Sequence, residues 1–312
     1  MPRALVFPGQ GAQYVGMGGE LAQRFPCARN LLDEADRALG FALSDIMANG
    51  PEADLTRTDV SQPAILVASA MSLAVAQEVI KPLTCAAVAG LSLGEYTALY
   101  AAGVLSFTDA VKLVRLRGEA MQAAADAVPG GMVALIGADE VSAAALCAEA
   151  ANGEVLAVAN LNSPGQVVIS GARGACMRAI ELAKKHNIRR AMSLPVAGAF
   201  HSPLMTPAAD RLKAALAGVV FKDPQWPVYA NVTAKPVTKA HEVPPLLVAQ
   251  LTSPVRWADS VVAMQAAGVR EFLELGPGKT LGGMITRTVK DVLCRNLDVV
   301  ADAGLLVAAS AG

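Results

Sequence analysis

The sequence predicts an α/β protein built from two structural units. Short apolar runs typical of strands alternate with longer segments of helical spacing, and glycine-rich turns follow several of these runs. Between about residues 129 and 196 the order changes to strand, helix, strand, strand, helix, strand. Because 54% of the 312 residues are hydrophobic but only 4% are aromatic, alanine and small aliphatic side chains must form most of the core.

The first strand is predicted over residues 3–7 and ends in a glycine-rich loop, Pro8-Gly9-Gln10-Gly11. The glycine spacing fits neither common phosphate-binding loop, so we expect this loop to supply backbone amides to a site rather than to bind a nucleotide. Helical spacing then runs from Leu21 to Met47, and Ser61-Gln62-Pro63 is predicted to begin a helix over residues 64–79.

A short apolar run, residues 85–89, leads through Gly90-Leu91-Ser92-Leu93-Gly94 into a helix predicted over residues 95–102. Glycines on both sides of a serine allow a sharp turn that exposes the hydroxyl, and the free amides of the following helix favour developing negative charge. Ser92 is therefore a candidate nucleophile. Ser92 and Glu95 also have the spacing of a helix capping box, and this pattern alone leaves both interpretations open.

The next helix is predicted from Ser106, with Asp109 completing a capping box, to about Ala127. Arg117 lies on the otherwise apolar stripe of this helix, which is a costly position unless an anion meets the guanidinium. Two interpretations stay open: a structural arginine at the core edge or paired with a core carboxylate, and a ligand of a substrate carboxylate. Arg115 lies on another face and is interpreted as a surface or structural charge.

The region with the changed order begins after Pro129. Strands are predicted over residues 132–136, 155–160, 166–170 and 190–194, and helices over 139–151 and 172–186. This order is that of the ferredoxin-like motif, a compact unit that can be inserted into a larger domain. We therefore expect a small ferredoxin-like domain over residues 129–196, inserted into a discontinuous large α/β domain formed by residues 1–128 and 197–312.

Four further elements are predicted in the large domain. They are a helix over residues 207–216, a strand around 228–230, a helix over 244–251, and a strand over 269–275 that ends in a Gly276-Pro277-Gly278 turn. The alanine-rich tail beyond about residue 296 is expected to be partly disordered.

A serine nucleophile needs a base, and histidine is the usual one because its pKa lies near neutrality. His186 belongs to a basic run, Lys184 to Arg190, typical of a solvated helix end, and His241 lies in a polar loop. His201 instead follows Gly198-Ala199-Phe200, residues small or apolar enough to line a pocket. His201 is therefore the candidate base, and a purely structural histidine is the alternative.

Composition argues against several classes of function. The formal net charge of −1 gives no general attraction to nucleic acid or to an anionic membrane. The five cysteines never form a CxxC pair, which argues against a disulfide framework or a zinc site. The amino terminus lacks the apolar region of a signal peptide, and the most apolar run, Ala64 to Ala76, is short for a membrane span. We expect a cytoplasmic protein.

Several separated motifs occur in a fixed order between about residues 3 and 290. They are Phe7-Pro8-Gly9-Gln10-Gly11, Gly90-x-Ser92-Leu93-Gly94-Glu95, Arg117, Asn162-Ser163-Pro164-Gly165-Gln166, Gly198-Ala199-Phe200-His201-Ser202, Gln250-Leu251 and Gly276-Pro277-Gly278. Together they resemble the malonyl-CoA:acyl carrier protein transacylases of bacterial type II fatty-acid synthesis. A set of motifs in the right order is far more specific than a single GxSxG.

The resemblance implies a role for each matching residue. Ser92 is expected to take the malonyl group and His201 to act as its general base, oriented by the main-chain carbonyl of Gln250. The backbone amides of Gln10 and Leu93 are expected to form the oxyanion hole.

The resemblance also implies a substrate site and a reaction. Arg117 is expected to hold the free malonyl carboxylate through two parallel hydrogen bonds, with Met121, Asn162 and Phe200 in the substrate site. The expected reaction transfers malonate from malonyl-CoA through a malonyl-serine to the phosphopantetheine thiol of acyl carrier protein. We expect no cofactor or metal, a monomer, and a large α/β-hydrolase-like domain with a parallel sheet core. Because such carrier proteins are acidic, the basic run from Lys184 is a candidate docking edge, with a solvated helix end as the alternative.

One position departs from the family, because Leu91 stands where these enzymes usually have histidine. This departure keeps open a homologue that binds carrier protein with weak turnover. A serine hydrolase is the other alternative. However, an α/β-hydrolase would need a late histidine and none follows His241, while a patatin-like enzyme would need an Asp-Gly step that the chain lacks.

Overall fold

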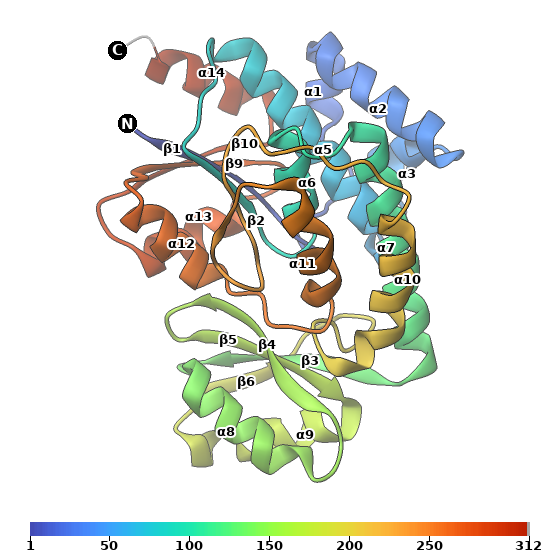
Figure 1. The fold of residues 1–312 in the computed structure, drawn as a ribbon, viewed down its shortest axis with the longest axis vertical. Helices are drawn as coiled ribbons and strands as arrows, with labels where there is room; N and C mark the ends of the chain where they lie inside the picture. Colours follow the sequence, from blue (N-terminus) through green and yellow to red (C-terminus); the bar gives the residue numbers. More distant parts are fainter. Residues whose placement is uncertain (311–312) are drawn as a thin grey trace.

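The computed structural model describes residues 1–310 and contains two β-sheets of different size (Figure 1). In the larger sheet the strand order is β10-β9-β1-β2-β7-β8, and every pairing is parallel except β7 with β8. Its strands are β1 (Arg3–Phe7), β2 (Ala87–Gly90), β7 (Val228–Tyr229), β8 (Pro236–Val237), β9 (Glu271–Leu275) and β10 (Leu293–Leu297). The predicted α/β class with a parallel-rich sheet is confirmed.

Helices cover both faces of this sheet because its strands alternate apolar side chains between the two sides. In β1, Leu5 and Phe7 join the core formed with α5 and α7, whereas Ala4 and Val6 join a second core formed with α12 and α13. The helices around the large sheet are α1 (Gly19–Arg24), α2 (Pro26–Leu39), α3 (Leu43–Asn49), α4 (Glu52–Thr56), α5 (Thr58–Val79), α6 (Gly94–Ala101), α7 (Phe107–Ala127), η2 (Pro203–Met205), α10 (Thr206–Leu216), η3 (Ala240–Glu242), α11 (Val243–Gln250), α12 (Trp257–Ala266), α13 (Thr280–Thr288) and α14 (Val300–Ser310).

The smaller sheet is antiparallel, with the order β4-β5-β3-β6, and lies below the large sheet in Figure 1. It has its own apolar core, in which strand residues such as Val133 and Ile169 pack with helix residues such as Leu146. Its elements are β3 (Gly130–Ile136), α8 (Glu140–Ala151), β4 (Leu156–Ser163), β5 (Gln166–Ala172), α9 (Arg173–Leu182), η1 (Ala183–His186) and β6 (Arg190–Ser193). These elements follow the order predicted for this region and differ from the predicted bounds by a few residues.

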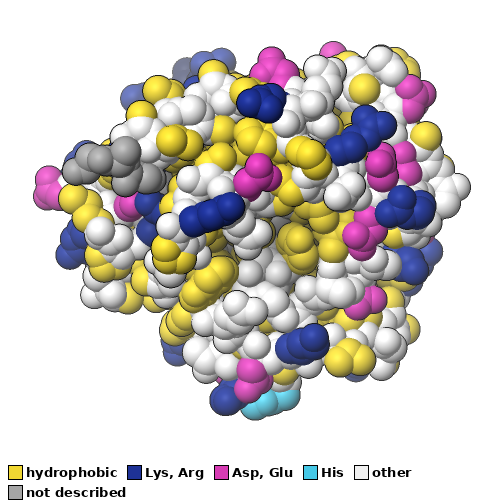
Figure 2. Space-filling model, turned by 90° about the horizontal axis from the view of Figure 1, so that it is seen from above, with side chains coloured by type: hydrophobic (Ala, Val, Ile, Leu, Met, Phe, Trp, Pro, Cys, Tyr) yellow, Lys and Arg dark blue, Asp and Glu magenta, His cyan; other side chains and the backbone are white. Residues whose placement is uncertain are grey.

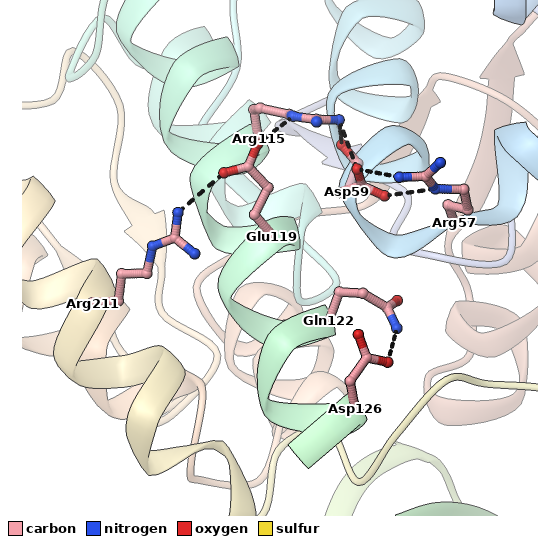
Figure 3. A network of polar contacts seen from close by, with 7 residues as sticks. All are labelled: Arg57, Asp59, Arg115, Glu119, Gln122, Asp126 and Arg211. Carbon is pink, nitrogen blue, oxygen red and sulfur yellow. Dashed lines mark hydrogen bonds and ion pairs between the residues drawn. The ribbon is translucent and has the colours of Figure 1, made fainter. Parts of the chain in front are cut away.

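Helix α5 begins at Thr58, so the prediction that residues 61–63 start it is wrong. Pro63 lies inside the helix and has no N–H to donate to the carbonyl of Asp59 four residues earlier. Arg115 Nη1 donates to that carbonyl at 2.8 Å and also pairs with the Asp59 carboxylate, as Figure 3 shows. Arg115 is thus a structural charge, as interpreted from the sequence, and it ties α7 to the start of α5.

Three other predictions need correction. The helical segment predicted from Leu21 to Met47 is divided into three helices, because Pro26 begins α2 and Gly40 ends it in a left-handed conformation. The interpretation of Ser92 and Glu95 as a capping box is wrong, since no side chain caps α6 and Glu95 is buried. The tail is ordered from residue 293 to residue 310 as β10 and α14, because Ala303 and Leu306 are buried in the main core. The last two residues of that prediction lie outside the described part.

Helix α5 is long and apolar enough to cross a bilayer, yet 94% of its most apolar window is buried inside the structure. It is the central helix of the main core, in contact with α2 and α7, which is why it carries apolar residues on all sides. On the face shown in Figure 2, Lys and Arg side chains are interspersed with Asp and Glu. This mixture agrees with the net charge near zero.

Candidate active site

The candidate site lies at the carboxyl edge of the parallel strands, where the turns after β1 and β2 pack against each other. A Cβ on Gly9 would lie 2.4 Å from the carbonyl oxygen of Leu91, and one on Gly94 would lie 2.2 Å from that of Phe7. Only glycine permits these approaches. The loop after β1 is therefore held directly against the turn that carries Ser92.

Ser92 has a positive φ of 52°, a strained conformation for a residue with a side chain. Its hydroxyl oxygen lies 2.8 Å from Nε2 of His201. Its backbone N–H donates to the side-chain oxygen of Asn231 at 2.7 Å. The sharp strand-to-helix turn predicted from the sequence is thus present, and it presents the hydroxyl to the histidine.

His201 is 4% exposed and is oriented by the backbone of α11. Its Nδ1 lies 2.8 Å from the carbonyl oxygen of Gln250. Because a carbonyl only accepts, Nδ1 carries the proton and Nε2 is left to accept the proton of the Ser92 hydroxyl. Burial and the nearby Arg117 charge lower the pKa of His201 to about 4, so the imidazole is neutral at physiological pH.

Arg117 reaches the same hydroxyl from α7 and is only 1% exposed. Its Nη2 donates to Ser92 Oγ at 3.0 Å and to the side-chain oxygen of Gln250 at 2.9 Å, and its Nη1 donates to that of Gln62 at 2.7 Å. Within residues 1–310 no carboxylate forms an ion pair with this guanidinium, and burial lowers its pKa. The alternative of a direct ion pair with a core carboxylate is therefore not found. The guanidinium donates to neutral oxygens and to the nucleophile and lies 5.6 Å from the centre of the Tyr96 ring, while Glu95 acts on it only electrostatically.

Glu95 is a buried acceptor behind the nucleophile. Its Oε2 accepts from the side-chain amide of Gln250 at 2.6 Å and from the backbone N–H of Asn231 at 3.3 Å. Burial raises the pKa of its carboxyl to about 7, although these hydrogen bonds and Arg117 act in the opposite direction. The carboxyl therefore loses its proton within the physiological pH range.

Replacing Glu95 by glutamine is expected to flatten the pH dependence of stability. Since the folded-state pKa of about 7 exceeds the ordinary 4.5, the folded protein binds more protons between these values. Its unfolding free energy thus loses up to about 3 kcal/mol from this group as the pH rises through that window. Denaturant unfolding at pH 5 and pH 8 should show a smaller loss for Glu95→Gln than for the wild type. Exposed Glu181→Gln is the control, and parallel curves for wild type and Glu95→Gln would contradict the assignment.

The other predicted site residues are placed as follows. Leu93 directly precedes α6, so its amide has no helical acceptor, and Gln10 lies in the loop held against Leu91. Met121 is buried on α7, and its sulfur accepts a hydrogen bond from Gln62. Phe200 is buried next to His201, and Asn162 is buried at the end of β4 with an unpartnered side-chain oxygen. Geometry thus joins Ser92, His201, Gln250 and Arg117 directly, and Met121 through Gln62.

Sequence reasoning missed three residues of this network: Gln62, Glu95 and Asn231. The sequence indicates Glu95 only as a possible helix cap and as one position of a family motif, without a role in the site. Asn231 stands one residue after Ala230, which ends an apolar strand, and a polar residue at the carboxyl end of a buried parallel strand is a usable signal. Gln62 had no such signal, because a glutamine in an apolar helix shows its partner only in three dimensions.

Leu91 is half-buried and packs against the apolar cluster that contains Trp257 and Val255. Its backbone N–H donates to the carbonyl of Phe7 at 3.0 Å. The residue that departs from the expected pattern therefore fills a hydrophobic position behind the turn. Within residues 1–310 no three His, Cys, Asp or Glu side chains are grouped to hold a metal ion.

Comparisons with known proteins match the chain over nearly its whole length. Residues 4–307 match the family model described as "Acyl transferase domain". The chain is 43% identical over 298 residues to a malonyl CoA-acyl carrier protein transacylase of Haemophilus influenzae, covering 96% of each. The crystal structure of an acyl carrier protein S-malonyltransferase from Vibrio cholerae superposes with a TM-score of 0.94 at 43% identity, covering 98% of this chain and 100% of the other.

A further solved structure is described as a type II PKS acyl-carrier protein in complex with its malonyl-transacylase. It superposes with a TM-score of 0.94 at 40% identity and covers 99% of this chain and 100% of the other. The resemblance stated from the sequence motifs is confirmed by these matches.

Proposed function

The chain belongs to the acyl transferase family, and from this premise we infer that it is an acyltransferase that moves a malonyl group from malonyl-CoA to acyl carrier protein. The observation that carries the chemistry is the position of one hydroxyl: Ser92 Oγ lies 2.8 Å from a neutral imidazole and 3.0 Å from a buried guanidinium. The relatives support this function and not the hydrolase or binding-only alternatives.

The first half-reaction loads the enzyme. Ser92 Oγ attacks the thioester carbonyl of malonyl-CoA while its proton passes to His201 Nε2, and the carbonyl oxygen becomes an oxyanion. We assign the stabilisation of this oxyanion to the backbone amides of Gln10 and Leu93. The close packing of the two turns that carry these amides supports the assignment. The carbon–sulfur bond then breaks, and the CoA thiol leaves with the proton from His201.

The second half-reaction reverses these roles. The phosphopantetheine thiol of the carrier gives its proton to His201 and attacks the malonyl ester, and Ser92 leaves with that proton. Because the thioester supplies the activated acyl group, we propose that no cofactor takes part. We also propose, as the sequence leads us to expect, that the protein is a monomer and that it is cytoplasmic.

Arg117 is the proposed ligand of the malonyl carboxylate. A guanidinium that is 1% exposed and donates only to neutral hydrogen-bond acceptors is poised for an anion. No carboxylate of residues 1–310 forms an ion pair with it, so the malonyl carboxylate would be its first ion-pair partner. Met121, Asn162 and Phe200 stay assigned to the substrate site. The side-chain oxygen of Asn162 is buried and accepts no hydrogen bond from the described residues, which supports the assignment of Asn162 to the substrate site.

We also propose the two domains expected from the sequence, with residues 129–196 as a ferredoxin-like unit inserted into an α/β-hydrolase-like domain of residues 1–128 and 197–312. The element order and the strand order β4-β5-β3-β6 support the small domain. The basic run from Lys184 to Arg190 is the proposed carrier-docking edge. In it Lys184, Arg189 and Arg190 are exposed, whereas Lys185 and His186 pair with Glu149.

Incubation with malonyl-CoA is expected to add the mass of one malonyl group to the protein, on Ser92. Adding acyl carrier protein that bears phosphopantetheine should discharge this ester. Intact-mass spectrometry follows both steps, and peptide mapping locates the ester. Ser92→Ala should form no adduct, whereas Ser260→Ala, a buried serine on α12, should behave as the wild type. A wild-type protein without adduct, or an adduct that persists in Ser92→Ala, would disprove the proposed mechanism.

A further inference from the structure

One side-chain amide, that of Asn231, spans the strained turn that carries the nucleophile. Asn231 follows β7, which pairs with β2, so its side chain reaches the turn from the neighbouring strand. Its Oδ1 accepts from the backbone N–H of Ser92 at 2.7 Å, and its Nδ2 donates to the carbonyl of Gly90 at 2.7 Å. The amide thus bridges the backbone from the Gly90 carbonyl to the Ser92 N–H, across Leu91, the residue before the nucleophile.

The orientation of this amide is fixed by its partners. A backbone N–H only donates and a backbone carbonyl only accepts, so the oxygen must face Ser92 and the nitrogen must face Gly90. Asn231 itself is 1% exposed and held by its own backbone, because its N–H donates to Glu95 and its carbonyl accepts from the N–H of Arg256 at 2.8 Å. Such a residue has little freedom to move when Ser92 reacts.

The same residue is connected to the group that orients the base. Gln250 holds His201 through its main-chain carbonyl, while its side-chain nitrogen donates to Glu95 Oε2 at 2.6 Å and to the backbone carbonyl of Ser92 at 3.0 Å. Asn231 donates to the same Glu95 oxygen. Asn231, which contacts the nucleophile, and Gln250, which orients the base, therefore both donate to the buried carboxyl of Glu95.

We propose that Asn231 is a positioning residue: its side chain holds Ser92 at positive φ, so that Oγ stays within hydrogen-bond distance of His201 Nε2. Strained backbone persists only where its surroundings over-determine it. Asn231 holds the entry to the strained residue through the Ser92 N–H and the Gly90 carbonyl, while the Ser92 carbonyl is held by Gln250. The proposal rests on the proposed function, because it concerns transfer through Ser92. It also predicts a structural change in the variants, a longer distance from Ser92 Oγ to His201 Nε2, which can be measured without an activity assay.

The test is a double-mutant cycle on the rate of malonyl-ester formation in a single turnover. Asn231→Ala is expected to slow acylation by about 10²-fold, the effect of misplacing a reacting atom by about 1 Å, while the KM for malonyl-CoA changes little. In a His201→Ala background the same change should cost less than about threefold, because Oγ then has no base to be aligned with. A merely structural role would give the same loss in both backgrounds.

Asn231→Leu is the second variant, since leucine fills the space but removes the side-chain hydrogen bonds to Ser92 and Gly90 and the longer one from Gln250. Asn160→Ala, a buried asparagine on β4, is the control and should acylate within about threefold of the wild type. Crystal structures of the variants should show Ser92 Oγ beyond hydrogen-bond distance of His201. Wild-type rates in Asn231→Leu, equal losses in both backgrounds, or an unmoved Ser92 would overturn the proposal. Absence of a malonyl ester in the wild type would instead overturn the proposed function, and the crystal structures would still decide the role of Asn231.

Discussion

Replacing His201 by alanine is expected to slow malonyl-ester formation on Ser92 by about 10²- to 10⁴-fold, the usual contribution of a positioned general base. The reason is geometric, because Nε2 is the acceptor placed 2.8 Å from the hydroxyl and the opposite nitrogen is held by the Gln250 carbonyl. KM for malonyl-CoA should change little, since the lost interaction acts on the transition state. Rapid-quench mass spectrometry measures the rate.

The matched control is His241→Ala. His241 lies in η3 and is exposed, so its loss should leave the acylation rate unchanged. The pH dependence gives an independent check. A base whose pKa is lowered to about 4 stays neutral as the pH falls through 6.5, so kcat/KM of the wild type should fall only on approach to pH 4. An acid limb at or above pH 6.5 would contradict the role given to burial and to Arg117.

The fold was largely readable from the sequence because its signals are local. The serine turn, the strand over residues 3–7 and the βαββαβ order depend on short-range spacing and on glycine positions. Errors arose where tertiary contacts decide. Helix α5 begins before Pro63 because Arg115, 52 positions along the chain, supplies the hydrogen bond that proline lacks. The alanine-rich tail folds because the main core takes up Ala303 and Leu306.

The site was partly readable for the same reason. Ser92 and His201 stand in distinctive local contexts, and the family resemblance supplied Gln250, whose main-chain carbonyl has no sequence signature of its own. Glu95 shows the limit most clearly. Its spacing from Ser92 is that of a cap, yet it turns inward because Gln250 and Asn231 offer donors from segments 136 or more residues away. Buried polar networks are specified by partners distant in sequence, which no local pattern reveals.

Replacing Arg117 by alanine is expected to remove the preference for malonyl over acetyl groups. A malonyl carboxylate brought into this buried site without its guanidinium would be an unpaired charge, which costs about 3–5 kcal/mol, or roughly 10²- to 10⁴-fold in kcat/KM. Acetyl-CoA carries no such charge, so the ratio of malonyl to acetyl transfer should fall by that factor. Competition of the two thioesters for one enzyme, read by intact mass, measures the ratio directly.

Arg115→Ala is the matched control on the same helix, because Arg115 pairs with Asp59 of α5 and with Glu119 of its own helix rather than with the site (Figure 3). It should lower stability without changing the malonyl-to-acetyl ratio, whereas Arg117→Lys should recover little of the malonyl preference, since an ammonium lacks the planar fork.

Loss of the Arg117 charge should also raise the pKa of His201 and move the acid limb of acetyl transfer upward from pH 4, because that charge disfavours the imidazolium. An unchanged ratio together with an unmoved limb would remove Arg117 from both roles, whereas a moved limb with an unchanged ratio would leave it only as the electrostatic partner of the base.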